Sequence, residues 1–156
     1  IFNLHVVGGY KDKYYEHEVN ELVQEGSLSQ QVIFYGWQTQ EQIFQVHEKC
    51  RIFILPSQQE TMPVVIGEAM ALGKVVVASN VGAVSEMITD KSSGFLFERN
   101  NVDQLCNLLR LLHKNNTLIE SVSGNAMREA REKFHPDSIA SKTHEFYLKV
   151  LKNASI

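Results

Sequence analysis

The chain has 156 residues, of which 44% are hydrophobic and 21% charged, so its composition is that of an ordinary globular protein with room for one domain and a sizeable core. Its 15 basic and 18 acidic residues give a formal net charge of -3 with no long run of either sign, which excludes the basic surface of a nucleic-acid-binding protein. No apolar run is long enough to span a membrane, and Cys50 and Cys106 match no metal or redox spacing, which favours a reduced, cytoplasmic protein.

Short apolar runs alternate with longer segments of helical periodicity along the chain. Strands are expected where the apolar runs end at turns, over residues 2–7, 32–35, 51–55, 75–78 and 94–97. Helices are expected over residues 14–24, 40–49, 63–72 and 84–88, and from about 102 onward with breaks at 115–116 and 135–136. Alternating strands and helices are joined by right-handed crossovers. The predicted fold is therefore a single α/β domain over residues 1–156, with a Rossmann-like, doubly wound parallel sheet.

The loop after the strand at 51–55 carries the densest polar signal, and ligands of such sheets bind beyond the carboxyl ends of the strands. Pro63 is expected as the first helical residue, with Thr61 or Met62 at the cap. The free N–H groups of Val64 and Val65, with the positive end of the helix dipole, would then form an anion site that fits a pyrophosphate. Most helix starts of this kind bind only water, so this feature alone does not decide the function.

Two glutamates flank that helix start. Glu68 is the only polar side chain between Pro63 and Leu72, on a helix expected to be largely buried, where an unpaired carboxylate costs several kcal/mol. Its two acceptor oxygens suit the neighbouring hydroxyls of a ribose; the alternative is a structural role, capping backbone N–H groups or pairing with Lys74. Glu60 lies in the loop, where it would meet the far end of the ligand; the alternative is a solvated loop acid. Gly67 predicts a close approach of the helix to the sheet.

Glu60 and Glu68, with seven residues between them, lie within Pro-Ser-x-x-Glu and Glu-Ala-Met-Ala-x-Gly. This block resembles the signature of glycosyltransferase family 4, whose members are retaining enzymes of the two-domain GT-B architecture. The resemblance extends through residues 74–79, 81–88 and 93–96, and covers 32–36 and, more loosely, 134–147. The chain departs from the family pattern at Met62 and Pro63, where many members have Phe and Gly, and at Ala83, where a second Gly is usual.

The resemblance implies a role for each of these positions. Glu60 would be the catalytic residue that binds hydroxyls of the donor sugar, and Glu68 would bind the ribose hydroxyls. The backbone at Met62, Val64 and Val65 would hold the diphosphate. The loop Gly36-Trp37-Gln38 would meet the nucleobase, largely through backbone groups.

The implied reaction is transfer of a sugar from a nucleoside diphosphate, UDP or GDP, to an acceptor hydroxyl with retained configuration. It would serve the synthesis of surface polysaccharide or glycolipid, with the acceptor bound by an N-terminal domain. No cofactor is expected, and no metal, because the family does not use one in this role and the sequence has no paired-aspartate motif. Two other classes stay open, a non-catalytic nucleotide-sugar-binding module and a sugar-nucleotide epimerase of GT-B shape. The Glu60 and Glu68 pair favours the transferase.

Compared with the family's C-terminal domain, the sequence lacks the first strand and helix, whose turn supplies an Arg and a Lys for the diphosphate. We therefore expect this chain by itself to be inactive. We also expect it to self-associate through open strand edges beside the missing strand and through the apolar stripe of its last helix, formed by Ile139, Phe146, Tyr147, Val150 and Leu151. The full-length enzyme is expected in the cytoplasm, with peripheral association at the inner face of the membrane as an option.

Overall fold

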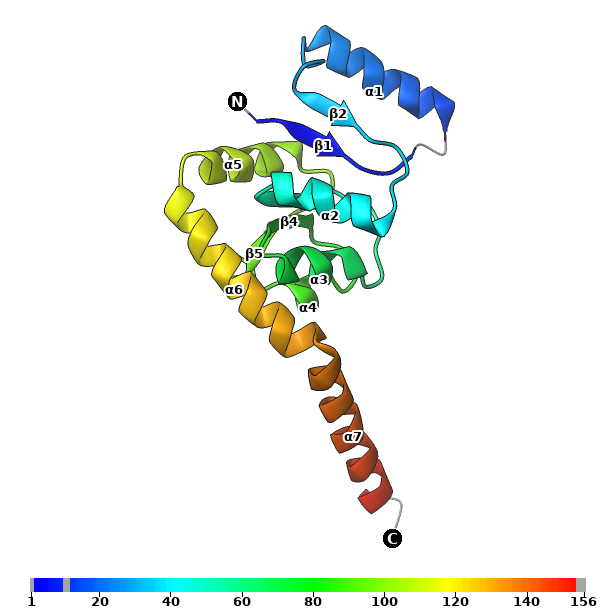
Figure 1. Ribbon diagram of the computed structural model, residues 1–156, viewed down its shortest axis with the longest axis vertical. Helices are drawn as coiled ribbons and strands as arrows, with labels where there is room; N and C mark the ends of the chain where they lie inside the picture. The colour runs from blue at the N-terminus through cyan, green and yellow to red at the C-terminus, as the bar shows by residue number, and fades with distance from the viewer. Residues whose placement is uncertain (1, 10–11, 154–156) are drawn as a thin grey trace. The chain divides into compact units, whose positions relative to one another are not determined.

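The computed structural model describes residues 2–9 and 12–153. The chain divides into two compact units, Ile1–Lys49 and Cys50–Ile156. Figure 1 colours the first unit blue to cyan and the second cyan-green to red. In both units helices alternate with strands, and every strand pairs in parallel with its neighbour. The predicted α/β class with parallel sheets is confirmed. That residues 1–156 form one nucleotide-sugar-binding domain stays a prediction, and each unit is described by itself.

The first unit is a pair of parallel strands with two helices. β1 (Leu4–Val6) and β2 (Val32–Phe34) pair in register, connected through α1 (Lys13–Glu25), and α2 (Gln40–Lys49) follows β2. The side chain of Asp12 caps α1 by accepting a hydrogen bond from the N–H of Tyr14 at 2.8 Å. Among the described residues of this unit only Val46 is buried, so the unit has little hydrophobic core of its own.

The second unit is built on a three-stranded parallel sheet in the order β3 (Ile52–Leu55), β4 (Val75–Ser79), β5 (Gly94–Phe97). Every residue of β4 is buried, because this strand is central and both faces of the sheet are covered. Val76 and Ala78 point into one hydrophobic cluster, and Val75 and Val77 into another. This period-2 alternation shows that the sheet has a core on each face, as a doubly wound fold requires.

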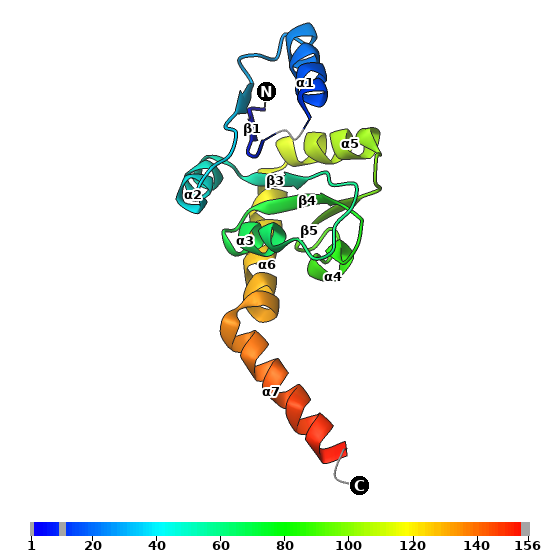
Figure 2. The same cartoon turned by 90° about the vertical axis from the view of Figure 1, so that its right-hand side faces the viewer.

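Each face of this sheet has its own helices (Figure 2). α3 (Val64–Ala71) and α4 (Val84–Met87) contribute to the cluster of Val76 and Ala78, and α5 (Val102–His113) contributes to the opposite one. The long helix α6 (Asn116–Phe134) reaches both clusters, with Ala126 and Ala130 in the first and Ile119 and Val122 in the second. The predicted doubly wound arrangement is confirmed in this unit.

The predicted helix breaks near 115 and at 135–136 are also found. Asn115 caps α6 by accepting a hydrogen bond from Leu118 N–H, and His135 is extended, as the residue before a proline must be. Pro136 then opens α7 (Pro136–Asn153), which leads away from the sheet in Figure 1. None of the described residues of α7 is buried, so its predicted apolar stripe is exposed; the last three residues of the expected helix lie outside the described residues. Self-association through this apolar stripe stays a prediction.

Among the described residues, no helix combines the length and the apolar character needed to cross a membrane.

Glu129 of α6 connects this helix to the loop between α4 and β5 through a hydrogen bond with Thr89. Its Oε1 accepts hydrogen bonds from Thr89 Oγ1 at 2.9 Å and from Lys133 Nζ at 2.6 Å. Burial raises the pKa of the Glu129 carboxyl, but hydrogen bonds from Lys133, Ser93 and Thr89 and the charge of Lys133 outweigh burial and hold the pKa below its ordinary value. The ionised carboxylate is therefore the form that the fold favours.

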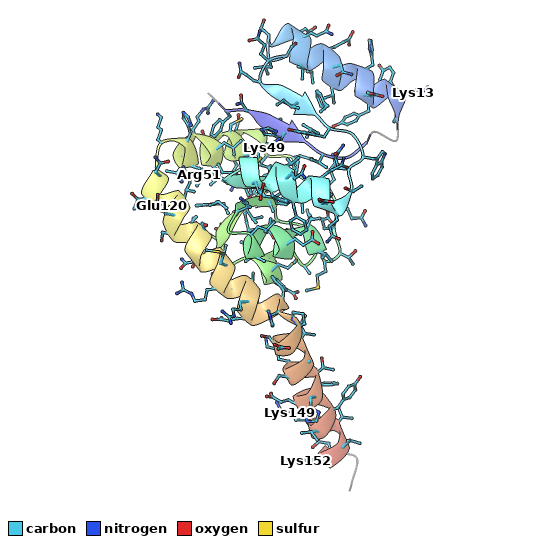
Figure 3. The ribbon with its side chains drawn as sticks, in the orientation of Figure 1. Lys13, Lys49, Arg51, Glu120, Lys149 and Lys152 are labelled. Carbon is cyan, nitrogen blue, oxygen red and sulfur yellow. The ribbon has the colours of Figure 1, made fainter. Side chains whose placement is uncertain are left out.

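Glu129→Gln is expected to lower the free energy of unfolding at pH 7 by about 1 kcal/mol, since the pair is partly exposed to solvent. A carboxyl whose pKa is lowered by folding contributes stability above its unfolded pKa, about 4.3, and loses it as the pH falls through the folded pKa. The difference between wild type and variant should therefore shrink as urea unfolding is measured at successively lower pH. Glu120→Gln, at an exposed acid near the start of the same helix (Figure 3), should show no such trend. A difference independent of pH would contradict the assignment.

Candidate functional site

The loop between β3 and α3 lies at the carboxyl end of the sheet of the second unit, as predicted. Glu60 stands in this loop and is partly buried. Its Oε1 accepts a hydrogen bond of 2.7 Å from the hydroxyl of Ser57. Ser79, buried at the end of β4, donates its hydroxyl to the carbonyl oxygen of Ser57. The carboxylate of Glu60 is therefore partly buried and hydrogen-bonded to Ser57, and it is not the freely solvated loop acid of the alternative interpretation.

The loop between β4 and α4 packs against the backbone of Glu60 and Thr61. Ala83 N–H donates to the carbonyl oxygen of Thr61 at 3.0 Å. Gly82 has a φ of +55°, and a Cβ added there would lie 2.8 Å from the carbonyl carbon of Glu60 and overlap its oxygen. Only glycine permits both this backbone conformation and this close approach. The position of Glu60 therefore depends on a residue of another loop that the sequence did not single out.

The start of α3 differs by one residue from the prediction. Pro63 is extended, with a ψ of 107°, and acts as the N-cap, so neither Thr61 nor Met62 caps the helix and Val64 is its first residue. The N–H of Ile66 donates to the carbonyl of Pro63 at 3.0 Å. Within the described residues, the N–H groups of Val64 and Val65 have no acceptor, and no side chain caps the helix. The two donors of the predicted anion site are therefore not used by the described part of the chain, and binding of an anion there stays a prediction.

Glu68 is exposed, and the prediction that it lies on a largely buried helix is wrong. α3 buries Ile66, Ala69 and Met70, and leaves Glu68 on the opposite face with Val64, one turn earlier. The two structural alternatives are not found either, because the Glu68 carboxylate makes no ion pair with Lys74 and caps no N–H group within the part of the chain that the structure describes. Glu68 is therefore an unpaired, solvent-facing carboxylate beside the open helix start.

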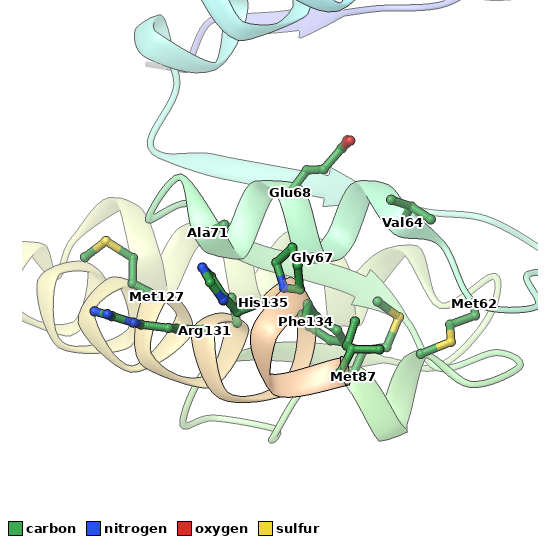
Figure 4. A pocket seen from close by; sticks show the side chains of 13 residues that line it. Met62, Val64, Gly67, Glu68, Ala71, Met87, Met127, Arg131, Phe134 and His135 are labelled. Carbon is green, nitrogen blue, oxygen red and sulfur yellow. The ribbon is translucent and has the colours of Figure 1, made fainter. Parts of the chain in front are cut away.

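An apolar groove of 670 Å³ lies between α3 and the helices α4, α6 and α7. Gly67 is one of its lining residues, and its role differs from the predicted one. A Cβ on Gly67 would lie 3.2 Å from the ring of Phe134, so this glycine lets α3 approach α6 and not the sheet. Figure 4 shows Glu68 pointing away from the groove. Sequence reasoning did not find this groove, which is lined by residues of four helices and their flanking loops: Met62, Val64, Gly67, Glu68, Ala71, Met87, Met127, Ala130, Arg131, Phe134, His135, Pro136 and Ile139.

The predicted nucleobase loop, Gly36-Trp37-Gln38, belongs to the first unit. Gly36 has a φ of +65°, and its carbonyl oxygen accepts a hydrogen bond of 2.9 Å from Gly8 N–H. The side-chain amide of Gln38 donates to the carbonyl oxygens of Tyr35 at 2.6 Å and Trp37 at 3.0 Å. The side chain of Gln38 thus holds the loop in shape.

Trp37 is 78% exposed. Its indole lies against Gly9, where an added Cβ would come within 2.8 Å of the indole Cδ1. The loop therefore exposes the large aromatic side chain of Trp37 to solvent, with one side of the indole packed against Gly9.

The structure brings together five of the predicted site residues, Glu60, Met62, Val64, Val65 and Glu68, in one loop and helix start of the second unit. Gly36, Trp37 and Gln38 form their own loop in the first unit. A group of three or more His, Cys, Asp or Glu side chains that could hold a metal ion is not found among residues 2–9 and 12–153. Sequence reasoning did not identify Ser57, Ser79 or Gly82 as residues that contact and position Glu60.

The model of one protein family, glycosyl transferases group 1, matches residues 2–132. The chain belongs to this family. Its likeness to the family's C-terminal GT-B domain, first seen in the block around Glu60 and Glu68, is thereby confirmed.

Individual relatives agree with the family. A sulfoquinovosyl transferase of Arabidopsis thaliana is 33% identical over 106 residues, which are 65% of this chain and 20% of the relative. A Campylobacter jejuni enzyme, N,N'-diacetylbacillosaminyl-diphospho-undecaprenol alpha-1,3-N-acetylgalactosaminyltransferase, is 31% identical over 111 residues, 71% of this chain and 29% of the relative. HepE of Anabaena, solved in complex with UDP, shares the fold with a TM-score of 0.86 at 24% identity, over 95% of this chain and 41% of that one. This chain of the group 1 family thus spans less than half the length of each of the three.

Proposed function

We propose that this chain is the donor-binding part of a retaining glycosyltransferase, which holds a nucleoside diphosphate sugar while the sugar passes to an acceptor hydroxyl. One observation carries the proposal. The N–H groups of Val64 and Val65 are open at the start of α3, with Glu60 before them and Glu68 after them, and neither carboxylate is ion-paired within the described residues. An anion site flanked by two carboxylates that can still accept hydrogen bonds matches a ligand that carries a diphosphate between two groups rich in hydroxyls.

The diphosphate would lie at the start of α3. The N–H groups of Val64 and Val65 and the positive end of the helix dipole stabilise negative charge there, with the backbone of Met62 beside them. Negative charge grows on the diphosphate as its bond to the sugar breaks. Donors that are already in place lower the barrier for that step.

The two carboxylates would bind the two ends of the donor. Glu60 has one oxygen engaged by Ser57, which leaves the other to accept hydrogen bonds from the sugar. Glu68, one turn beyond Val64, offers both oxygens to the ribose. The loop with Gly36, Trp37 and Gln38 would meet the base.

The UDP bound in the Anabaena structure supports a uridine nucleotide, with GDP as the other candidate. No metal or cofactor is included in this proposal. The acceptor would be bound outside this chain, and the names of the Arabidopsis and Campylobacter relatives support glycolipid or surface polysaccharide synthesis. We place the full-length enzyme in the cytoplasm, with peripheral association at the inner face of the membrane as an option.

Glu68→Gln in the full-length protein is expected to weaken binding of the nucleoside diphosphate about 10- to 100-fold, since hydrogen bonds to a charged group contribute about 1.5–3 kcal/mol. Stability should change by less than about 0.5 kcal/mol, because the side chain is exposed and unpaired. Calorimetric titration and thermal unfolding measure the two effects. Glu120→Gln serves as the matched surface control. Unchanged affinity together with lost stability would make Glu68 a structural residue.

The reaction itself is tested with the full-length protein, a panel of UDP-, GDP- and ADP-linked sugars and a membrane extract as acceptor. Proton NMR of the product reports the anomeric configuration. We expect the configuration of the donor to be kept. An inverted product would contradict the retaining mechanism, an altered sugar without an acceptor would indicate an epimerase, and binding without turnover would indicate a non-catalytic module.

A further inference from the structure

The hydroxyl of Ser57 is directed at Glu60. Ser57 Oγ donates to Glu60 Oε1 at 2.7 Å, the usual length of a well-formed O–H···O hydrogen bond. Both side chains are partly buried and lie three residues apart in the same loop. Ser57 thus fixes one oxygen of Glu60, which limits the rotamers of that side chain.

Ser57 is held in turn by the sheet. Ser79 is the last residue of β4, is only 2% exposed, and donates its hydroxyl to the carbonyl oxygen of Ser57. The same hydroxyl is 3.4 Å from the carbonyl oxygen of Leu55, the last residue of β3. Because β4 is the fully buried central strand, this contact connects the loop to the buried centre of the sheet. Ser79 at the end of β4 therefore binds the backbone of Ser57, and the side chain of Ser57 binds Glu60.

We propose that Ser57 and Ser79 are positioning residues for Glu60, and we name the pair the serine relay. The relay holds Glu60 Oε1 and leaves Oε2 directed to the hydroxyls of the donor sugar; this inference rests on the proposed function of Glu60. The proposal assigns neither serine a contact with the donor. A carboxylate that is fixed before the donor arrives loses less conformational entropy on binding and is already aligned for the transfer step.

The test uses the full-length protein and the fastest donor among UDP-, GDP- and ADP-glucose. Ser57→Ala is expected to lower kcat about 10- to 100-fold, the effect of losing a hydrogen bond to a charged group, with the Kd for the bare nucleoside diphosphate changed less than about twofold. Ser57→Thr keeps the hydroxyl and should restore most of kcat, which a purely structural role would not predict. Ser79→Ala should also lower kcat.

Two matched controls separate the relay from a general loss of hydroxyl groups. Thr89→Ala removes a hydroxyl that donates to the carboxylate of Glu129 at 2.9 Å, and Ser123→Ala removes one that donates to the carbonyl of Gly73 at 2.6 Å. Both should leave kcat unchanged. A Ser57→Ala kcat within twofold of wild type, or failure of Ser57→Thr to recover kcat when Ser57→Ala has lost it, would overturn the relay.

Crystal structures of Ser57→Ala and Ser79→Ala decide the relay independently of any donor. We expect the Glu60 carboxylate to leave its wild-type position in the first and the loop from Ser57 to shift in the second. An unmoved carboxylate in both would overturn the relay. By contrast, full transfer activity of Glu60→Ala would refute the proposed role of Glu60 and leave the relay to be judged by these structures.

Discussion

Glu60→Ala in the full-length protein is expected to reduce sugar transfer by roughly 10²- to 10⁴-fold, the effect of losing two charge-assisted hydrogen bonds of about 1.5–3 kcal/mol each. The carboxylate is partly buried, held through Ser57 and without an ion pair among the described residues, so its remaining acceptor capacity is available to the donor sugar. Affinity for the bare nucleoside diphosphate should stay nearly intact, because Glu60 lies before the helix start where the phosphates would bind.

Initial rates of transfer and calorimetric titration of UDP and UDP-glucose separate the two effects of Glu60→Ala. Glu120→Ala, at an exposed acid on α6, is the control and should behave as wild type. Equal loss of affinity for UDP and UDP-glucose would show that Glu60 binds the nucleotide and not the sugar.

Gly82→Ala is expected to lower the free energy of unfolding by about 2–5 kcal/mol and to reduce transfer at least about 100-fold. The alanine would adopt an unfavourable φ of +55°, with its Cβ 2.8 Å from the carbonyl carbon of Glu60. Since that neighbour is backbone, the chain must move, and the Glu60 loop must move with it. Urea unfolding and initial rates measure the two losses.

Gly124→Ala is the matched control for Gly82→Ala. Gly124 lies within α6, and an added Cβ would meet nothing within 4 Å. Alanine in a helix interior is favoured over glycine by about 1 kcal/mol, so this variant should be as stable as wild type or more stable, with full activity. If Gly82→Ala behaved in the same way, the close approach of the two loops would not be needed to place Glu60.

Local sequence patterns predicted the strands and the helix breaks because their causes are local. The run at 75–78 became the buried strand β4, and the extended backbone that a proline imposes on its predecessor separated α6 from α7 at His135. The site loop was found for the same reason, because an acid and a helix start after a strand are local features.

The side of α3 that faces solvent could not be predicted in this way. Between Val64 and Leu72 the sequence is apolar except for Glu68, so no polar stripe marks an outer face, and Glu68 was assigned to a buried helix. The structure shows Val64 71% exposed and Ile66 fully buried, a difference that packing against the sheet and α6 decides. Because Glu68 is exposed, its carboxylate does not have the energetic cost of burial that the sequence-based prediction assumed. The carboxylate is still available to a ligand.

The supports of Glu60 are the other feature that the sequence could not predict. Ser79 lies 22 residues from Ser57, and Gly82 meets Glu60 across two loops, so both contacts exist only after the strands have paired. For Ser57 a local signal was present, since a hydroxyl three residues before a carboxylate in a loop can form a hydrogen bond with it.

Calorimetric titration of the full-length protein with UDP, GDP and ADP and their glucose conjugates tests the central claim most directly. The proposal predicts that one nucleoside diphosphate binds and that its sugar conjugate binds more tightly, with the added affinity lost in Glu60→Ala and the nucleotide affinity lowered in Glu68→Gln. A folded wild-type protein that binds none of these nucleotides or nucleotide sugars would contradict it.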